Sequence, residues 1–423
     1  MTLRCGTAYN YTDMIPTLGW RADMQTFCRR VRALTPDERV LLALVAAAFL
    51  SVYTIVLALL VLPFYLVFTR RFVPMLRASR GAPLLGLFCV VALAVTIRYG
   101  DTRAVALGIG MLFAAVAILF IKYAMTRRAF RLMLTISCAG SLFAFFVALA
   151  QRLWLTQFLF QGRACATFVN ANFYAAVIEI TTLFAVYRLL RPGRLTRTIF
   201  YVAVLLANMG GLYLCQSRAA FLVVFGGIAL LLALTDRRYL GHACAVVLCM
   251  LLLYAGRAVW MPRLDQMSSD LDVGREEIWR TAGRMIRDNL LCGRGYLSYQ
   301  QFYRAYHGFA ANHAHNLLLD LLVNFGVVGA GLLLAYLAVN LAGIVRMYFS
   351  GAERSKSALA LSVLATVLVH GLVDATVCWP QTAILVVAVI SYSRAYSDMP
   401  QAREGATVQL PRHGQAKKSA IQP

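Results

Sequence analysis

Residues 103–122 read RAVALGIGMLFAAVAILFIK, an apolar run whose only charged residues are the two at its ends. A helix of about 20 apolar residues crosses a hydrocarbon core roughly 30 Å thick. Similar runs recur along the chain, at 40–69, 82–97, 129–150, 173–190, 198–215, 219–235, 241–257, 316–346, 358–377 and 380–397. The sequence therefore predicts an all-α, polytopic membrane helix bundle.

The composition agrees with this prediction. Of 423 residues, 61% are hydrophobic and 14% are charged, with a mean hydropathy of +0.69, whereas soluble proteins are about 25% charged. The first 39 residues lack the apolar region of a cleavable signal peptide, so we expect none. The net charge of +23 comes from arginines that cluster between apolar runs. Such clusters are typical of the positive-inside rule and of contact with anionic membrane lipids, so we expect no nucleic-acid partner.

The basic connectors predict the topology. They lie at Arg70–Arg80, Lys122–Arg131, Arg188–Arg197, Asp236–Tyr239 and Arg346–Lys356. If all five are cytoplasmic, the intervening segments 98–102, 151–172, 257–312 and Asp374–Trp379 lie outside.

The run 40–69 has basic residues on both flanks, which a single span does not accommodate on one side. A hairpin of two short helices that turns near Ser51–Thr54 keeps both flanks inside. This interpretation gives about twelve spans with both termini cytoplasmic. The alternative is eleven spans with an external N-terminus.

The predicted organisation has five parts. They are a cytoplasmic N-terminal segment (1–39), a first transmembrane block (40–256), one large external loop (257–312), a last transmembrane block (313–397) and a disordered cytoplasmic tail (398–423). Within the external loop, Gly274–Leu290 has helical periodicity. One face carries Ile278, Ala282, Met285 and Ile286, and another carries Arg280, Arg284 and Arg287. The pattern predicts an amphipathic helix in an ordered subdomain on the membrane surface.

Two histidines follow this loop in the run Asn312-His313-Ala314-His315-Asn316. With Asn312 as the N-cap, His315 lies in the first helical turn, where the positive helix end favours a neutral imidazole. A neutral imidazole suits a general base. The alternative interpretation is a set of interfacial polar residues at a helix start. His307, His313 and His315 also allow a metal site, but their spacing is not a strong metal pattern, and we expect no metal.

Three arginines lie on the predicted outer face, where the positive-inside rule does not explain them. They are Arg163 before a span, Arg218 between two spans, and Arg275 at the start of the amphipathic helix. The planar guanidinium binds phosphate through two hydrogen bonds and keeps its charge next to lipid. Together with the histidines, these arginines predict a phosphate site, although each alone is typical of a snorkelling surface residue.

Other polar residues have less definite interpretations. Glu179 lies inside a span and suggests a proton path. His370 and Asp374 are one helical turn apart and allow a hydrogen bond to each other. The ten cysteines have the character of small buried hydrophobes, and their spacing permits a disulfide between Cys165 and Cys292 without requiring one.

Several of these segments, taken in order, resemble the O-antigen ligase/polymerase superfamily. They are Thr167–Asn172, Ser217–Ala220, Gly274–Trp279, Asn289–Tyr296, His313–Leu317 and Gly326–Gly329, within about residues 160–380. The sequence departs from the family pattern at Ala171, where that pattern has proline, and lacks the usual proline before Cys292.

This resemblance implies an inverting glycosyltransferase of the bacterial inner membrane with its active site on the periplasmic side. The donor would be an undecaprenyl-pyrophosphate-linked polysaccharide and the acceptor a sugar hydroxyl of lipid A–core in lipopolysaccharide assembly. His315 would be the catalytic base, while Arg163, Arg218, Arg275 and His313 would bind substrate, without a cofactor. One dominant external loop favours a ligase. The alternatives are an O-antigen polymerase, a protein O-oligosaccharyltransferase, and a transporter of a lipid-linked anion.

Overall fold

The computed structural model describes residues 31–256, 268–351 and 353–393. Within these ranges the chain forms helices and connecting turns without any β-strand, so the all-α prediction is confirmed. The predicted tail at 398–423, the end of the last block and most of the segment 1–39 lie outside the described residues.

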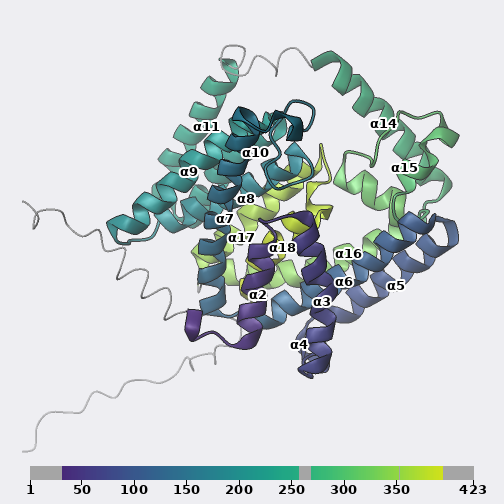
Figure 1. Cartoon of the computed structure of the whole chain (residues 1–423), viewed down its shortest axis with the longest axis horizontal. Coiled ribbons are helices and arrows are strands. Elements are labelled where there is room, and N and C mark those ends of the chain that lie inside the picture. Colours follow the sequence, from purple (N-terminus) through teal and green to yellow (C-terminus); the bar gives the residue numbers. More distant parts are fainter. Residues whose placement is uncertain (1–30, 257–267, 352, 394–423) are drawn as a thin grey trace, which may run out of the picture.

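Figure 1 shows the helices as one bundle, with α14 and α15 at one corner. The first block contains α2 (Pro36–Ala47), α3 (Val52–Phe68), α4 (Phe72–Ala78), α5 (Ala82–Tyr99), α6 (Thr102–Ala124), α7 (Arg127–Leu153), α8 (Ala171–Leu189), α9 (Leu195–Cys215), α10 (Arg218–Thr235) and α11 (Leu240–Ala255). The rest contains α14 (Ser268–Asp288), α15 (Ser298–Phe302), the 3-10 turn η4 (Tyr303–Tyr306), α16 (Leu317–Phe349), α17 (Arg354–Gly371), the turn η5 (Thr376–Cys378) and α18 (Pro380–Ile390).

Among the described residues, seven helices are long and apolar enough to cross a membrane, or eight if the pair α3 and α4, bent by 99°, is one span. These helices are typical of a multi-pass membrane protein. The total of twelve spans is not confirmed and stays a prediction.

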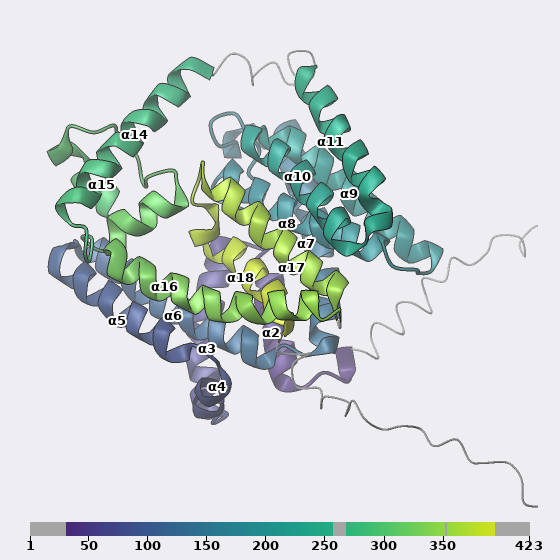
Figure 2. The ribbon, with the colours of Figure 1, turned by 180° about the vertical axis from the view of Figure 1, so that it is seen from behind.

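Helices α8 and α17 are absent from those seven for a physical reason. In α8, 14 of 19 residues are buried, including Glu179, and in α17, 11 of 18 are buried, including Lys356 and His370. Helices α7, α9 and α10 pack against α8, and α10, α16 and α18 pack against α17; Figure 2 shows α17 beside α10 and α16. Polar side chains inside a bundle avoid lipid, so a central helix is less apolar than a peripheral one.

The run 40–69 forms the expected antiparallel hairpin. Its two helices are α2 and α3, and Ser51 caps α3 by accepting a hydrogen bond from the Thr54 amide. Near the open end, the Tyr65 hydroxyl of α3 donates to Asp37 of α2 at 2.6 Å. The start of α2 therefore lies against the end of α3.

The basic connectors gather at one end of the bundle. Hydrogen bonds join them: Lys122 Nζ to the Arg80 carbonyl at 3.1 Å, and Arg191 Nη2 to Ser355 Oγ at 2.8 Å. The loop before α16 and the turn after α17 lie at the other end. This arrangement agrees with the alternation predicted from charge.

The described part of the predicted loop, 268–312, forms a small subdomain. Its helix α14 buries Ile278, Ala282 and Met285, as the periodicity predicts, together with Tyr299 of α15 and Val323 of α16. Its arginines Arg280, Arg284 and Arg287 are exposed. The subdomain therefore has its own apolar core and rests on α16.

Two glycines fasten the subdomain to a kink in α16. At Gly326 the helix is interrupted by φ 60° and ψ −169°, a conformation essentially restricted to glycine. The amides of Val327 and Val328 donate to the carbonyls of Leu290 and Leu291 at 2.9 and 3.0 Å. A Cβ at Gly293 would lie 2.5 Å from the Asn324 carbonyl, so both positions require backbone-to-backbone contact.

We predict that Gly326→Ala destabilises the protein by about 1–3 kcal/mol or more, because alanine disfavours this conformation and its methyl group collides with Leu291. Gly331→Ala is the matched control in the same helix, since nothing lies within 4 Å of its Cβ position. Thermal unfolding in detergent measures both variants. Equal melting temperatures for the two would contradict this role of Gly326.

Candidate functional site

A cavity of about 770 Å³ opens where α8, α10, α14 and the loop before α16 meet. All five predicted site residues, Arg163, Arg218, Arg275, His313 and His315, line it. The other residues in the lining are Phe160, Gln161, Asn170, Asn172, Gln216, Gly274, Ile278, Gln300, Gln301, Tyr303, Arg304, Phe309, Ala310, Ala311 and Asn312. The fold therefore brings together residues that are far apart in the sequence.

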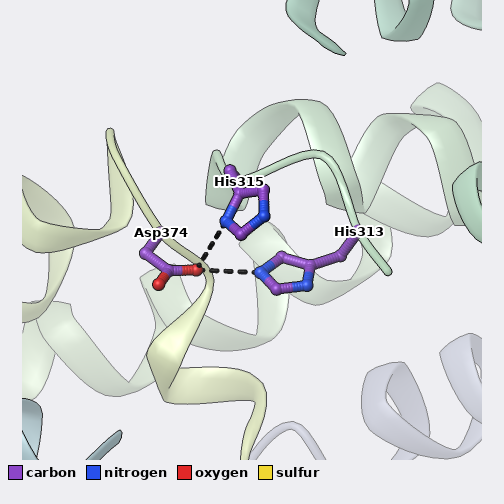
Figure 3. Close-up of side chains that lie close together, drawn as sticks. All are labelled: His313, His315 and Asp374. Carbon is purple, nitrogen blue, oxygen red and sulfur yellow. Dashed lines mark hydrogen bonds and ion pairs between the residues drawn. The ribbon is translucent and has the colours of Figure 1, made fainter. Parts of the chain in front are cut away.

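The two histidines share one carboxylate oxygen (Figure 3). His313 Nε2 lies 2.8 Å from Asp374 Oδ1, and His315 Nδ1 lies 3.3 Å from the same atom. The second contact is an ion-pair distance without hydrogen-bond alignment, since the buried His315 Nδ1 has no hydrogen-bond partner. The ring centroids are 4.2 Å apart. One carboxylate thus holds two imidazoles side by side.

The helix start differs from the sequence prediction. Asn316, rather than Asn312, is the N-cap of α16, and its side chain accepts from the amides of Leu318 and Leu319 at 3.0 and 3.1 Å. His315 precedes the helix with a left-handed backbone, φ 47°, which is uncommon for a residue other than glycine. Contrary to the prediction, His315 therefore does not lie in the first helical turn, and Asp374 is the charged group in contact with both histidines.

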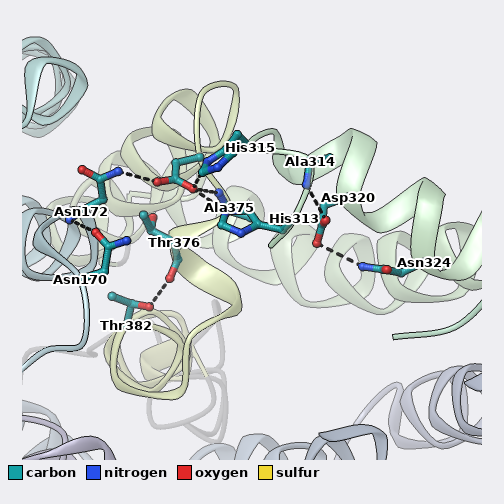
Figure 4. Close-up of polar contacts among 11 residues, drawn as sticks. Asn170, Asn172, His313, Ala314, His315, Asp320, Asn324, Ala375, Thr376 and Thr382 are labelled. Atoms are coloured by element: carbon teal, nitrogen blue, oxygen red, sulfur yellow. Dashed lines mark hydrogen bonds and ion pairs between the residues drawn. The ribbon is translucent and has the colours of Figure 1, made fainter. Parts of the chain in front are cut away.

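Asp374 is itself held from three sides, and Figure 4 labels its partners Asn172, Ala375 and the two histidines. Its Oδ2 accepts from Asn172 Nδ2 at 2.7 Å, and its Oδ1 accepts from the Ala375 amide at 2.9 Å. The Asn172 Oδ1 in turn accepts from Arg163 Nη2 at 2.7 Å. A chain of hydrogen bonds therefore runs from Arg163 through Asn172 and Asp374 to His313.

A second carboxylate shapes the histidine loop. Asp320 Oδ1 accepts from the Ala314 amide at 3.0 Å, and its Oδ2 accepts from Asn324 Nδ2 at 3.1 Å. Because Ala314 lies between the two histidines, this bond fixes the backbone that presents both rings.

Burial disfavours the charged forms of His313 and Asp374, but their mutual hydrogen bond and ion pair outweigh it. The pKa of His313 is raised, and the pKa of Asp374 is held well below its usual value. His313 and Asp374 therefore carry opposite charges over part of the physiological pH range.

The three predicted arginines have different surroundings. Arg163 donates to the Cys215 carbonyl at 2.7 Å as well as to Asn172, so it braces the site. Arg218 begins α10 directly after its N-cap Ser217, and Arg275 lies on the α14 side of the cavity. These two line the same cavity from opposite elements, which suits a shared anionic ligand.

Three possibilities that the sequence left open differ in the structure. His370 and Asp374 share a backbone hydrogen bond of 3.0 Å, but the His370 Nδ1 lies 2.6 Å from Glu179 Oε1, and both of these side chains are 1% exposed. Cys165 and Cys292 are free thiols. His307 ends the turn η4 and does not line the cavity.

The site contains the ligand types of a metal centre. His313, His315 and Asp374 offer ligand atoms within 4.8 Å of one another, and imidazole with carboxylate suits zinc. In the sequence, His307 is the candidate for a third metal ligand, whereas in the structure Asp374 lies beside the two histidines. Metal-independence stays a prediction.

Comparison with known proteins bears on the same residues. Residues 200–334 match the model of the O-antigen ligase family. The resemblance to the O-antigen ligase superfamily is confirmed over this stretch. The residues matched by this family model include Arg218, Arg275, His313 and His315. Arg163 and Asp374 lie outside the match. No curated protein matches the chain. The family comprises glycosyltransferase-like membrane enzymes, and it implies lipid-linked polysaccharide substrates in general.

We predict that Asp374→Asn destabilises the protein more at pH 6 than at pH 9. His313 binds its proton more tightly on folding, so its contribution is complete below the unfolded pKa of about 6.5 and fades as the pH rises through the folded pKa. The contribution of Asp374 is present above its unfolded pKa of about 3.9 and is lost as the pH falls toward its lower folded pKa. Melting temperatures of wild type and variant at both pH values measure the difference.

Asp236→Asn is the control for this experiment, because Asp236 pairs with Arg238 at 3.4 Å and arginine keeps its proton throughout this range. Its effect should be the same at pH 6 and pH 9. A loss of stability in Asp374→Asn that is the same at both pH values would show that His313 and Asp374 do not form an ionic pair.

Proposed function

We propose that this protein is an O-antigen ligase of the bacterial inner membrane. It transfers a polysaccharide from undecaprenyl pyrophosphate to a sugar hydroxyl of lipid A–core, on the periplasmic side. The observation that carries the proposal is a single cavity in which a carboxylate-held histidine pair faces arginines from α10 and α14.

The charges of the cavity suit the donor. Four arginines line it, Arg163, Arg218, Arg275 and Arg304, and the described lining contains no carboxylate. When the glycosidic bond to pyrophosphate breaks, negative charge develops on the leaving group. Arg218 and Arg275 stabilise that charge, which lowers the barrier most effectively in a site of low dielectric constant.

The histidine pair suits the acceptor. Asp374 lies against Nδ1 of His315, which leaves Nε2 to accept a proton, as in other carboxylate–histidine arrangements. His315 Nε2 removes the hydroxyl proton of the acceptor while that oxygen attacks the anomeric carbon. The bond from this carbon to the pyrophosphate oxygen breaks, its electrons leave with pyrophosphate, and the configuration inverts.

His313 has a positioning role in this proposal. Its hydrogen bond to Asp374 keeps the carboxylate in place, and the two rings are too close for two positive charges to be favourable. With His313 as the charged ring, His315 is the ring that accepts a proton.

The remaining lining residues suit sugars. Amide side chains from Gln300, Gln301 and Asn312, with the aromatic rings of Tyr303 and Phe309, surround the space in front of the histidines. A few fixed polar groups among apolar walls are typical of a small-molecule site.

The transporter alternative uses the same arginines but does not need a base at the cavity wall. A polymerase or a protein O-oligosaccharyltransferase would share the proposed chemistry and differ in its acceptor. Only the acceptor in a reconstituted reaction separates these from a ligase.

We predict that purified protein in detergent joins lipid-linked polysaccharide to lipid A–core, and that His315→Ala reduces the rate by about 10²–10⁴, the usual contribution of a general base. Detergent excludes transport as a readout. The measurement is the amount of ligated product, with His307→Ala as the control, since His307 lies outside the cavity lining.

Absence of product from the wild type would contradict the ligase proposal, and a normal rate for His315→Ala would contradict the role of His315. We expect activity to survive EDTA. Loss in EDTA with recovery on Zn²⁺, Mn²⁺ or Mg²⁺ would instead assign His313, His315 and Asp374 to a metal.

We predict that Arg218→Lys and Arg275→Lys each lose most of this activity, because lysine keeps the charge without the planar fork that binds phosphate. The double variant should lose less than the two single losses combined, since both residues contact one group. Arg280→Lys is the control on α14: its guanidinium pairs with Glu276 on the exposed face at 2.6 Å. Wild-type activity in both lysine variants would contradict the arginine clamp.

A further inference from the structure

A second cavity, of about 360 Å³, lies at the basic end of the bundle. It is lined by Arg127, Phe130, Arg131, Leu134, Tyr187, Arg188, Arg191, Glu353 and Lys356. These residues come from the start of α7, the end of α8 and the start of α17. None of them belongs to the candidate active site.

The two cavities lie at opposite ends of α8, separated by most of the thickness of a hydrocarbon core. Along α8, Arg188 is 16 residues from Asn172, which corresponds to about 24 Å of helix. Along α17, Lys356 is 14 residues from His370, or about 21 Å. The basic cavity therefore lies close to the depth of lipid headgroups on the opposite side of a hydrocarbon core roughly 30 Å thick.

The lining has a surplus of positive charge. It contains five cations and one carboxylate, and that carboxylate, Glu353, pairs with Lys356. The positive-inside rule explains basic residues in loops, but it does not require five of them to converge on one cavity.

Two of the arginines are held in place by neutral groups. Arg188 Nε donates to the Tyr201 hydroxyl at 2.9 Å, and Arg191 Nη2 donates to Ser355 Oγ at 2.8 Å. The Arg191 guanidinium also lies 4.6 Å from the centre of the Tyr187 ring. These contacts orient both guanidinium groups without cancelling their charge, which is the state that favours binding of an anion.

We propose that this cavity binds a phosphate group at the membrane surface, that of an anionic phospholipid. Because the cavity lies near the depth of lipid headgroups, a lipid is favoured over free phosphate as the source of this phosphate group. Buried Phe130 and Leu134 supply an apolar wall beside the cations, as a lipid headgroup with its glycerol backbone requires. Basic pockets between membrane helices are known to select such headgroups.

The test uses the full-length protein in neutral detergent, titrated with short-chain phosphatidylglycerol. Native mass spectrometry and the shift in melting temperature measure binding. Phosphatidylcholine and inorganic phosphate are titrated separately as the zwitterionic and the lipid-free probe. We expect saturable binding of phosphatidylglycerol alone.

Arg188→Gln/Arg191→Gln should weaken that binding at least about tenfold, given the usual contribution of a basic residue to anionic lipid binding. The matched control is Arg77→Gln/Arg80→Gln, which removes the same charge from exposed positions at the same end. Should the first variant fail to fold, Arg131→Gln tests the same cavity from an exposed position.

Equal weakening in the pocket and control variants would overturn the proposal in favour of diffuse attraction. Tighter binding of inorganic phosphate than of phosphatidylglycerol would overturn the lipid as source, and absence of lipid binding would overturn the site. Each outcome is independent of ligation, which the detergent assay measures separately.

Discussion

The arrangement of the candidate site depends on one buried carboxylate, that of Asp374, which is 2% exposed. A buried charge is costly unless opposite charges and hydrogen-bond donors surround it. Here the loop before α16 supplies two imidazoles, α8 supplies the Asn172 amide, and the turn after α17 supplies a backbone amide. Three parts of the chain therefore have to meet at one point, and that point is the wall of the large cavity.

A second buried carboxylate is paired in the same way, with a histidine about one helical turn before Asp374 in the chain. Glu179 of α8 and His370 of α17 form a second carboxylate–histidine pair, fully enclosed by helices. The Glu179–His370 pair joins α8 to α17, and the hydrogen bond from Asn172 to Asp374 joins α8 to the turn after α17, so these two parts of the chain are fixed to each other at successive depths. Because polar groups in a bundle avoid lipid, these two helices lie at the centre, and the apolar helices α7, α9, α10 and α16 pack against them.

Much of this architecture is predictable from local sequence signals. Apolar runs locate the helices, charge locates their basic ends, and the periodicity of Gly274–Leu290 identifies the buried face of α14. The start of α16 is not predictable in this way, since Asn312 and Asn316 satisfy the same capping rule. The Asn316 side chain also donates to the Leu372 carbonyl at 2.9 Å, a contact between residues distant in sequence that no local rule anticipates. The runs 173–190 and 358–377 correctly locate α8 and α17, but hydropathy alone does not show that these helices are buried among others.

The two ends of α17 show why similar charges serve different purposes. Both ends lie beside clusters of arginine, which bind phosphate whatever its source. At the cavity end, imidazoles stand next to the arginines, and an imidazole exchanges a proton near neutral pH. At the basic end, the described lining offers permanent cations and a carboxylate already paired with Lys356, so no group there is suited to accept a proton from a hydroxyl. In the functions proposed for the two cavities, the first end therefore has the groups for bond formation, whereas the second has the groups for binding alone.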